Sequence, residues 1–283
     1  MISIKDISIF ADGLDHTECI AVHPDGSIWA GGEGGQIYRI TSDGSKIEEL
    51  NNTGGFILGI AFSPSADWLA VCDLKNKCIF KYILLSNTIE KFADGADGQY
   101  FNIPNFPAFD SRGRLYVSES GAFREVKGKI FCFDQEGAGK VWHSGPFNFA
   151  NGLALSEDEK YLYIVCTWLP GVERVSINDN GTAGKREVYV TLPETCPDGI
   201  AFDREGSLYV SCYAPNRIYK INPDQEVRLL VDDWEGHTLS NPTNIAFGGN
   251  EFKELFTSNL GRWHISKLTL KLSGLGLACH QKR

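Results

Sequence analysis

The sequence predicts an all-β fold, a six-bladed β-propeller whose four-stranded antiparallel blades surround a central channel. A turn and an aromatic-rich second strand follow each of six copies of a short motif. A regular unit of about 40–50 residues built only of strands is typical of a propeller, whereas a sandwich shows no such register. The first residues of the motif lie 40 to 47 residues apart and are Glu18, Leu58, Asn105, Asn151, Asp198 and Thr243.

Each motif predicts the innermost strand of a blade. Its fourth position is alanine in all six copies, as in residues 58–62 (LGIAF) and 198–202 (DGIAF). Turn residues such as Pro24-Asp25-Gly26 end this strand, and a second strand follows. Third strands, for example residues 216–221, alternate apolar and polar side chains with a period of two.

Closure of the ring requires a strand from the other end of the chain. The sixth unit offers three strands and then a polar tail after residue 270, while residues 2–10 alternate apolar and polar side chains. We therefore expect residues 2–10 to complete the last blade. The sequence predicts a single domain over residues 1–283, with no linker.

Composition narrows the class of partner. The chain has 283 residues, with 27 Lys and Arg against 36 Asp and Glu, for a net charge of −9. This acidic balance argues against nucleic acid and against an anionic membrane surface as partners. No apolar run approaches the roughly 20 residues of a membrane helix, and residues 1–10 lack the features of a signal peptide. With eight cysteines in no metal-binding spacing, we expect a cytoplasmic protein whose thiols are free and mostly buried.

The first position of the motif carries the candidate chemistry, because equivalent positions of six inner strands form a ring around the channel. Glu18, Asn105, Asn151, Asp198 and Thr243 supply oxygens there, and no cationic side chain occurs in the row. Buried carboxylates need a counter-charge. Two carboxylates and two amides suit a hard divalent cation, Ca²⁺ first, with Mg²⁺, Mn²⁺ and Zn²⁺ as other candidates. A plug of hydrogen-bonded side chains and trapped water is the alternative interpretation.

Further residues are expected to line the mouth of this site, where an aromatic rim would suit a small, partly apolar substrate. Cysteines 72, 166 and 212, at the ends of second strands, are expected to pack between blades. Glu119 breaks that row, either as a further acid near the ring or as a residue in a wider gap. His16 and His264 are reserve proton shuttles, and each rim residue could equally be ordinary loop packing. The candidate substrate-binding residues are Phe106, Glu119, Trp168, Tyr213, Thr243 and Trp263.

Three features together carry a resemblance to a known family: the early Glu18, the unit that starts Asn151-Gly-Leu-Ala-Leu-Ser, and the unit Pro197-Asp-Gly-Ile-Ala-Phe-Asp. From about residue 12 to 270 the chain resembles the senescence-marker-protein/gluconolactonase/luciferin-regenerating-enzyme family. Its members are six-bladed propellers with a divalent ion, usually calcium, in the channel. The resemblance implies that Glu18, Asn151 and Asp198 are metal ligands and that Asn105 is a further asparagine near the ion. Diisopropyl fluorophosphatases and paraoxonases use a similar set.

Two departures from the family pattern bear on the substrate. Asn105 is followed by Phe106 rather than by aspartate, and no upstream arginine holds a sugar, which favours a more apolar lactone or an ester over a polyol lactone. The first blade reads Glu18-Cys19-Ile20. This resembles the strictosidine-synthase-like branch, in which the metal site is often lost, although its ligands are present here.

The resulting expectation is a calcium-dependent hydrolase that acts on an ester bond, a lactonase in which activated water attacks with Asp198 as general base. The expected partner is a small-molecule lactone or ester, and the expected state is a monomer or weak dimer. Two alternatives stay open. One is a phosphotriesterase at the same site, and the other is a non-catalytic ligand- or protein-binding propeller in which calcium is only structural.

Overall fold

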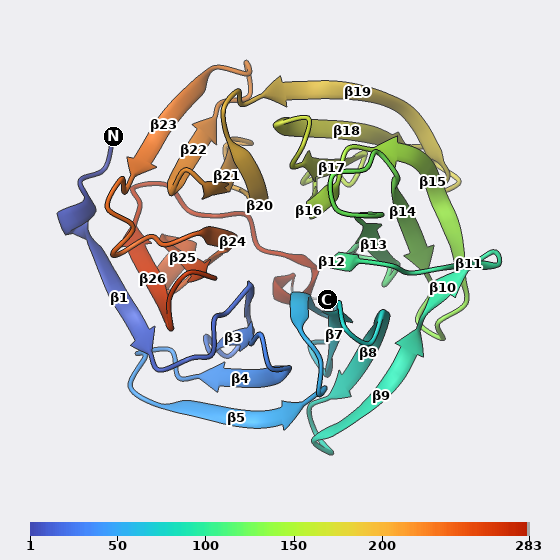
Figure 1. Ribbon diagram of the computed structural model, residues 1–283, viewed down its shortest axis with the longest axis horizontal. Coiled ribbons are helices and arrows are strands. Elements are labelled where there is room, and N and C mark those ends of the chain that lie inside the picture. Colours follow the sequence, from blue (N-terminus) through green and yellow to red (C-terminus); the bar gives the residue numbers. More distant parts are fainter. Residues whose placement is uncertain (282–283) are drawn as a thin grey trace.

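The computed structural model describes residues 1–281 and contains six four-stranded antiparallel sheets around a central channel (Figure 1). Five sheets consist of four consecutive strands, and the innermost strands of neighbouring sheets contact one another all the way around the ring. The predicted six-bladed β-propeller is confirmed. Within residues 1–281, no helical segment is long and apolar enough to cross a membrane.

The blades follow one another in chain order, each written here from its inner to its outer strand. Blade I consists of β2 (Cys19–Val22), β3 (Ile28–Gly31), β4 (Gln36–Ile40) and β5 (Ile47–Asn52), and blade II of β6 (Ile57–Phe62), β7 (Trp68–Asp73), β8 (Cys78–Ile83) and β9 (Thr88–Ala93). Blade III consists of β12 (Pro104–Phe109), β13 (Leu115–Glu119), β14 (Gly128–Phe133) and β15 (Gly139–Phe147), and blade IV of β16 (Ala150–Leu155), β17 (Tyr161–Cys166), β18 (Gly171–Ile177) and β19 (Ala183–Thr191).

The last two blades differ in how they are assembled. Blade V consists of β20 (Cys196–Phe202), β21 (Leu208–Ala214), β22 (Arg217–Ile221) and β23 (Val227–Asp232), and blade VI of β24 (Pro242–Gly248), β25 (Glu254–Asn259), β26 (His264–Thr269) and β1 (Ile7–Asp12). The smaller elements are a two-stranded hairpin, β10 (Gly95–Ala96) with β11 (Gln99–Tyr100), and three short 3₁₀ turns, η1 (Ile4–Asp6), η2 (Asn250–Phe252) and η3 (Ala278–His280).

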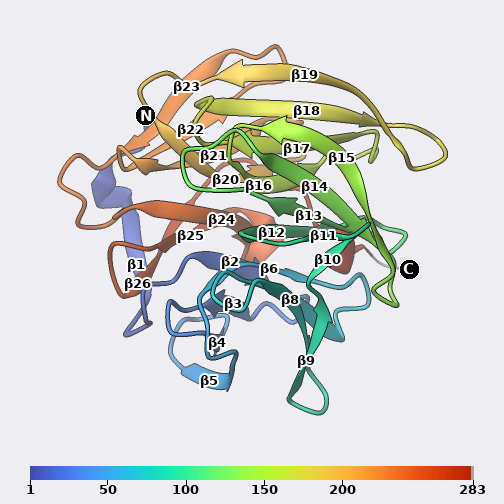
Figure 2. The same cartoon turned by 45° about the vertical axis from the view of Figure 1, so that its right-hand side comes forward.

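The ring closes through β1, which pairs antiparallel with β26 as the outer strand of blade VI (Figure 1, Figure 2). The expected strand at residues 2–10 is therefore wrong at both ends. The Ile2 amide donates to the Leu230 carbonyl (2.7 Å), and the Ser3 hydroxyl accepts from the Lys5 amide (3.3 Å), so residues 4–6 turn rather than pair. The strand then continues to Asp12 past a register shift after Ile9.

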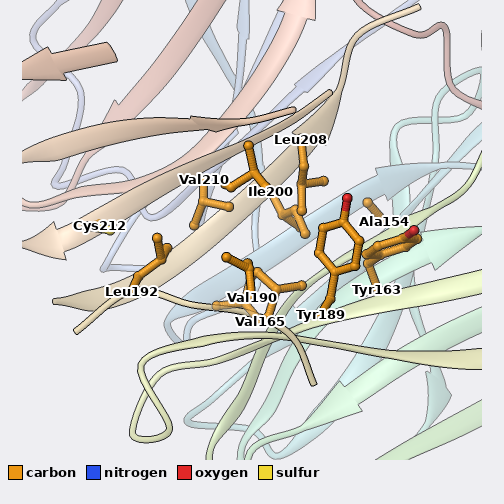
Figure 3. Packing of buried hydrophobic residues seen from close by; sticks show 12 residues of the cluster. Ala154, Tyr163, Val165, Tyr189, Val190, Leu192, Ile200, Leu208, Val210 and Cys212 are labelled. Carbon is orange, nitrogen blue, oxygen red and sulfur yellow. The ribbon is translucent and has the colours of Figure 1, made fainter. Parts of the chain in front are cut away.

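Apolar side chains fill the space between adjacent blades. Figure 3 shows the cluster between blades IV and V, where Tyr163 and Val165 meet Ile200 and Val210. Cys212 belongs to this cluster, and Cys72 and Cys166 are likewise fully buried, as expected of small residues between blades. All eight cysteines are unpaired, and seven of them are buried.

The segment after residue 270 is not the free polar tail expected from the sequence. In Figure 1 it runs back across the middle of the molecule to one end of the channel. The Leu275 amide donates to the Phe202 carbonyl (2.8 Å), Gly274 forms a β-bridge with Asp203, and the Cys279 side chain is buried. These contacts join parts of the chain about 70 residues apart, so no local sequence pattern could indicate them.

Candidate metal centre

The inner strands converge where the motif begins. Glycine holds the second position in three blades, and a Cβ added there would clash with the carbonyl oxygen of the first-position residue in the next blade. Gly59 meets Asn105 in this way, Gly152 meets Asp198 and Gly199 meets Thr243. The Asn-Gly and Asp-Gly pairs of the motif therefore have a structural cause, since only glycine allows this approach of neighbouring strands.

Four buried oxygens of residues at the first motif position have no hydrogen-bond partner. They are Glu18 Oε2, Asn105 Oδ1, Asn151 Oδ1 and Asp198 Oδ1. All four side chains are buried, with 3–6% of their surface exposed. Leaving one buried acceptor unsatisfied costs about 1–3 kcal/mol. Four such oxygens at equivalent positions of four blades form a donor set for a cation, and two carboxylates with two amides fit the preference of Ca²⁺.

The two asparagines are fixed with their oxygens free. The Asn105 amide nitrogen donates to the Ser120 hydroxyl (3.0 Å), and the Asn151 nitrogen donates to the Thr167 hydroxyl (3.2 Å). Each hydroxyl donates its own hydrogen bond to a backbone carbonyl of the next inner strand, at 2.7 Å for Ser120 and 2.9 Å for Thr167. The hydroxyl can therefore only accept from the asparagine, which holds the amide nitrogen outward and leaves the oxygen available.

The two carboxylates affect each other. Burial raises the pKa of Glu18 well above its ordinary value, and the neighbouring Asp198 charge raises it further. Burial also raises the pKa of Asp198. A divalent cation at these oxygens would lower both pKa values, because its charge would offset the burial and the repulsion between the two carboxylates. No cluster of three or more His, Cys, Asp or Glu side chains that could hold a metal occurs in the described part of the chain.

Of the predicted substrate-binding residues, Glu119 and Thr243 are buried and hydrogen-bonded to the backbone, and Phe106 lines a cavity. Glu119 accepts hydrogen bonds from the backbone amides of residues 102, 103 and 121, at 3.0–3.1 Å, and so fixes the segment that leads into Asn105. Thr243 is fully buried, and its hydroxyl donates to the Glu18 carbonyl (2.6 Å). Phe106 lines an apolar cavity further along the channel.

Two other predicted residues, Tyr213 and Trp263, are exposed. Tyr213 is 39% exposed, and the charges of Glu18 and Asp198 add to burial in raising the pKa of its phenol, so the hydroxyl lies within electrostatic reach of both acids. Trp263 is exposed, with its ring 5.2 Å from that of His16. His16 also approaches the Asp15 carboxylate (3.3 Å). His264 is buried, and its ring is hydrogen-bonded to the Thr238 carbonyl (3.0 Å).

An aromatic wall, formed by Phe123, Phe149 and Trp168, stands beside blades III and IV. Phe123 lies 5.4 Å from Trp168 and 6.2 Å from Phe149, and Phe149 lies 5.7 Å from Trp168, measured between ring centroids. Phe123 is 64% exposed, and the buried Trp168 Nε1 has no hydrogen-bond partner. Trp168 directly follows Thr167, whose hydroxyl accepts from the Asn151 amide, and the Thr167 amide donates to the Phe149 carbonyl (3.2 Å).

Sequence reasoning identified Trp168 but missed Phe123 and Phe149, because both lie in loops outside the repeated motif. It also missed Asn244. Asn244 follows Thr243, donates to the Glu18 carbonyl (3.3 Å) and has an unpartnered buried Oδ1. The signal was present, since an amide stands where three other blades have glycine.

Comparison with known proteins places this architecture among related chains. The model of the SMP-30/Gluconolactonase/LRE-like region matches residues 83–260. Regucalcin from Danio rerio is 28% identical over 48% of this chain and 50% of its own length. Gluconolactonase from Zymomonas mobilis is 27% identical over 60% of this chain and 53% of its own. The chain thus spans about half the length of the curated relatives it matches.

Solved structures match over almost the whole chain. A gluconolactonase from Xanthomonas campestris superposes with a TM-score of 0.80 at 18% identity, covering 93% of this chain and 89% of its own. A luciferin-regenerating enzyme superposes with a TM-score of 0.80 at 19% identity, covering 96% and 98%. At this level of identity the likeness shows the shared fold.

Proposed function

The chain belongs to the SMP-30/gluconolactonase/LRE-like family, and from that premise we propose that it is a calcium-dependent lactonase. The observation that carries the proposal is the set of four buried, unpartnered oxygens from Glu18, Asn105, Asn151 and Asp198. A metal-assisted hydrolase requires such a set at the mouth of a pocket, because the oxygens must bind a cation and still leave room for substrate.

A divalent cation held there would supply Lewis-acid stabilisation of the charge that develops on the lactone carbonyl oxygen. Asp198 is the proposed general base, which takes a proton from the attacking water. Addition of the water oxygen to the carbonyl carbon forms the new C–O bond, with the charge on the former carbonyl oxygen. Collapse of this tetrahedral species restores the C=O bond and breaks the ring C–O bond, and the proton passes to the leaving oxygen to give a hydroxy acid. Asn105 and Asn151, held by Ser120 and Thr167, position cation and substrate without adding negative charge.

The aromatic wall supports a substrate with an apolar substituent. Phe123 presents most of its surface to solvent beside Trp168, and exposed aromatic surface of this kind gains free energy by covering an alkyl or aryl group. Tyr213 and Trp263, which are also partly exposed, are the proposed contacts for the rest of the substrate. We therefore favour an alkyl- or aryl-substituted lactone or ester over a polyol lactone.

The proposal also includes a cellular compartment, a class of partner and an oligomeric state. Eight unpaired cysteines support a reducing, cytoplasmic compartment. A net charge of −9 supports a small-molecule partner rather than nucleic acid or a membrane surface. A monomer or weak dimer is sufficient, because every proposed site residue comes from one chain.

Replacement of Asp198 by alanine tests the proposed base and ligand. Lactone opening should fall by about 10²–10⁴-fold in the Asp198→Ala variant, and EDTA should abolish the activity of the parent protein. Asp179→Asn, in an exposed turn, is the matched control and should retain full activity. Undiminished lactone turnover by Asp198→Ala, with and without EDTA, would contradict the mechanism.

A substrate panel run beside that assay separates the alternatives. The panel is needed because lactone and phosphotriester hydrolysis would use the same oxygens. Preferential hydrolysis of a phosphotriester such as paraoxon would identify the protein as a phosphotriesterase. Tight binding of Ca²⁺ without hydrolysis of any lactone, ester or phosphotriester would favour a binding propeller with structural calcium.

A further inference from the structure

The alanine at the fourth position of every repeat has no part in the proposed lactonase. All six of these alanines line one cavity of about 110 Å³ in the channel, and the apolar residues on either side of each alanine line it as well. The six are Ala21, Ala61, Ala108, Ala154, Ala201 and Ala246. An invariant small residue at six equivalent positions thus leaves room along the axis, where a larger side chain would fill it.

A register shift in five of the six inner strands brings both rows to the channel. The first and fourth positions are three residues apart, so in a regular strand their side chains would face opposite sides. In blades III to VI the register of the inner strand shifts between the residue before the motif and its third position, for example between Ala150 and Leu153. In blade II it shifts between Ile57 and Gly59. The shift allows the oxygen row and the alanine row to line the same channel, about 10 Å apart along it.

The segment 273–281 forms the remaining wall of this cavity. Residues 275–279 and Gln281 line it, and Gly274 is pressed so closely on the Phe247 ring that a Cβ there would clash. The Arg204 amide donates to the Ser273 carbonyl (3.0 Å), and the Gly274 amide donates to the Phe252 carbonyl (2.8 Å). The segment is thus attached to blades V and VI by backbone hydrogen bonds and covers the axis.

The wall of this cavity provides few hydrogen-bond partners for a water molecule. Alanine, isoleucine, leucine, valine and phenylalanine form most of it, and the polar side chains among its lining residues are Ser156, Glu157, Glu159 and Gln281. Of these, Glu159 is already engaged by the amide (2.6 Å) and hydroxyl (2.8 Å) of Ser111, and Glu157 is exposed. A buried water needs about two to four polar partners, whereas an apolar cavity of about 150 Å³ stays dry and binds benzene or xenon.

We propose that the alanine-lined cavity is a binding site for one small apolar molecule of about the size of benzene, separate from the oxygen set and covered on one side by residues 273–281. Binding replaces empty space with dispersion contacts to all six blades and to the C-terminal segment. Binding therefore stabilises the folded chain, and it does not depend on the proposed lactonase activity.

Benzene itself is the probe, titrated into the intact chain while amide chemical shifts and the unfolding midpoint are followed. We expect saturable binding of one molecule, shifts confined to inner strands and residues 273–281, and a rise in Tm of about 3 °C for each tenfold excess over Kd. The Ala154→Leu variant should lose at least tenfold in affinity, because leucine occupies the cavity. The smaller change Ala201→Val serves if Ala154→Leu does not fold.

Ala138→Leu, in an exposed turn outside the cavity, is the control and should bind benzene as the parent chain does. Failure of the parent chain to bind benzene saturably would overturn the proposal. Equal affinity in the parent chain and in both cavity-filling variants would overturn it too, because the site would then lie elsewhere. Neither result would bear on lactone hydrolysis, which is measured separately.

Discussion

At the scale of single residues, the candidate metal centre depends on which end of each asparagine faces the channel. A serine and a threonine decide this, because each uses its proton on a backbone carbonyl and can only accept from the amide. Ser120 and Thr167 touch neither the proposed cation nor the substrate. They are positioning residues, and their removal would free the amide to turn.

Ca²⁺ affinity should therefore fall by about 10–100-fold in Ser120→Ala and in Thr167→Val. The measurement is calorimetric titration of Ca²⁺ into EDTA-stripped protein. Thr182→Val, which removes an exposed hydroxyl of the same kind, is the control and should bind as the parent does. An unchanged affinity in both positioning variants would show that the asparagine oxygens are not ligands.

Phe123 provides a prediction about specificity at the same scale. Truncation of Phe123 to alanine should raise KM several-fold for a γ-lactone with a long alkyl substituent, because the exposed face of the aromatic wall is lost. For unsubstituted γ-butyrolactone, KM should not change. Equal effects on both lactones, with the fold intact by circular dichroism, would show that the wall does not contact the substituent.

At the scale of elements, the repeated motif made the inner strands predictable, together with their turns and the row of oxygens. Period and turn chemistry are local properties, and β6, β16 and β20 begin within two residues of the motif. The start of β1 was not predictable, because residues 2–6 alternate like a strand yet bond to blade V and turn on Ser3. Phe123 and Phe149 were not predictable either, because they lie in single loops outside the sequence repeat.

The position of the C-terminal segment depends on contacts with residues that are distant in sequence. Leu275, Leu277 and Cys279 are apolar, but only the open end of a closed ring gives them a surface to cover. His280 lies against the Phe252 ring (4.9 Å) and next to Cys279. Burial lowers the pKa of His280 to about 4.

This shift makes the stability dependent on pH. The folded chain holds His280 neutral, while the unfolded chain binds a proton at an ordinary pKa near 6.5. Stability that is present above pH 6.5 is therefore lost as pH falls toward 4, by up to about 2 kcal/mol at pH 5. Chemical denaturation at pH 7 and pH 5 measures it. His280→Gln should lose less on acidification than the parent chain, and an equal loss would contradict the assignment.

At the scale of the whole molecule, the proposed cation would link four blades. Glu18 belongs to blade I, Asn105 to blade III, Asn151 to blade IV and Asp198 to blade V, and all four bring buried oxygens without partners. Occupation of the site would satisfy these oxygens and offset the repulsion between the two carboxylates. The channel then carries two unlike sites on one axis, a polar one at the first row and an apolar one at the fourth.

Removal of the ion should therefore destabilise the ring as a whole. At a Ca²⁺ concentration of 100 times Kd, the folded chain gains about 2.7 kcal/mol, so EDTA should lower Tm by about 5–10 °C. Differential scanning calorimetry with and without Ca²⁺ tests this. In Glu18→Gln the difference should shrink, since one of the two ligand charges is gone, while an undiminished difference would place the ion elsewhere.

The most direct test of the central claim is lactone opening measured against free Ca²⁺, on the same EDTA-stripped sample whose Ca²⁺ stoichiometry is determined by calorimetry. We predict one Ca²⁺ per chain, no turnover of an alkyl-substituted γ-lactone without it, and activity that rises with the same Kd as binding. Full turnover in the stripped protein, or one tightly bound Ca²⁺ with no turnover, would contradict the account of a calcium-dependent lactonase.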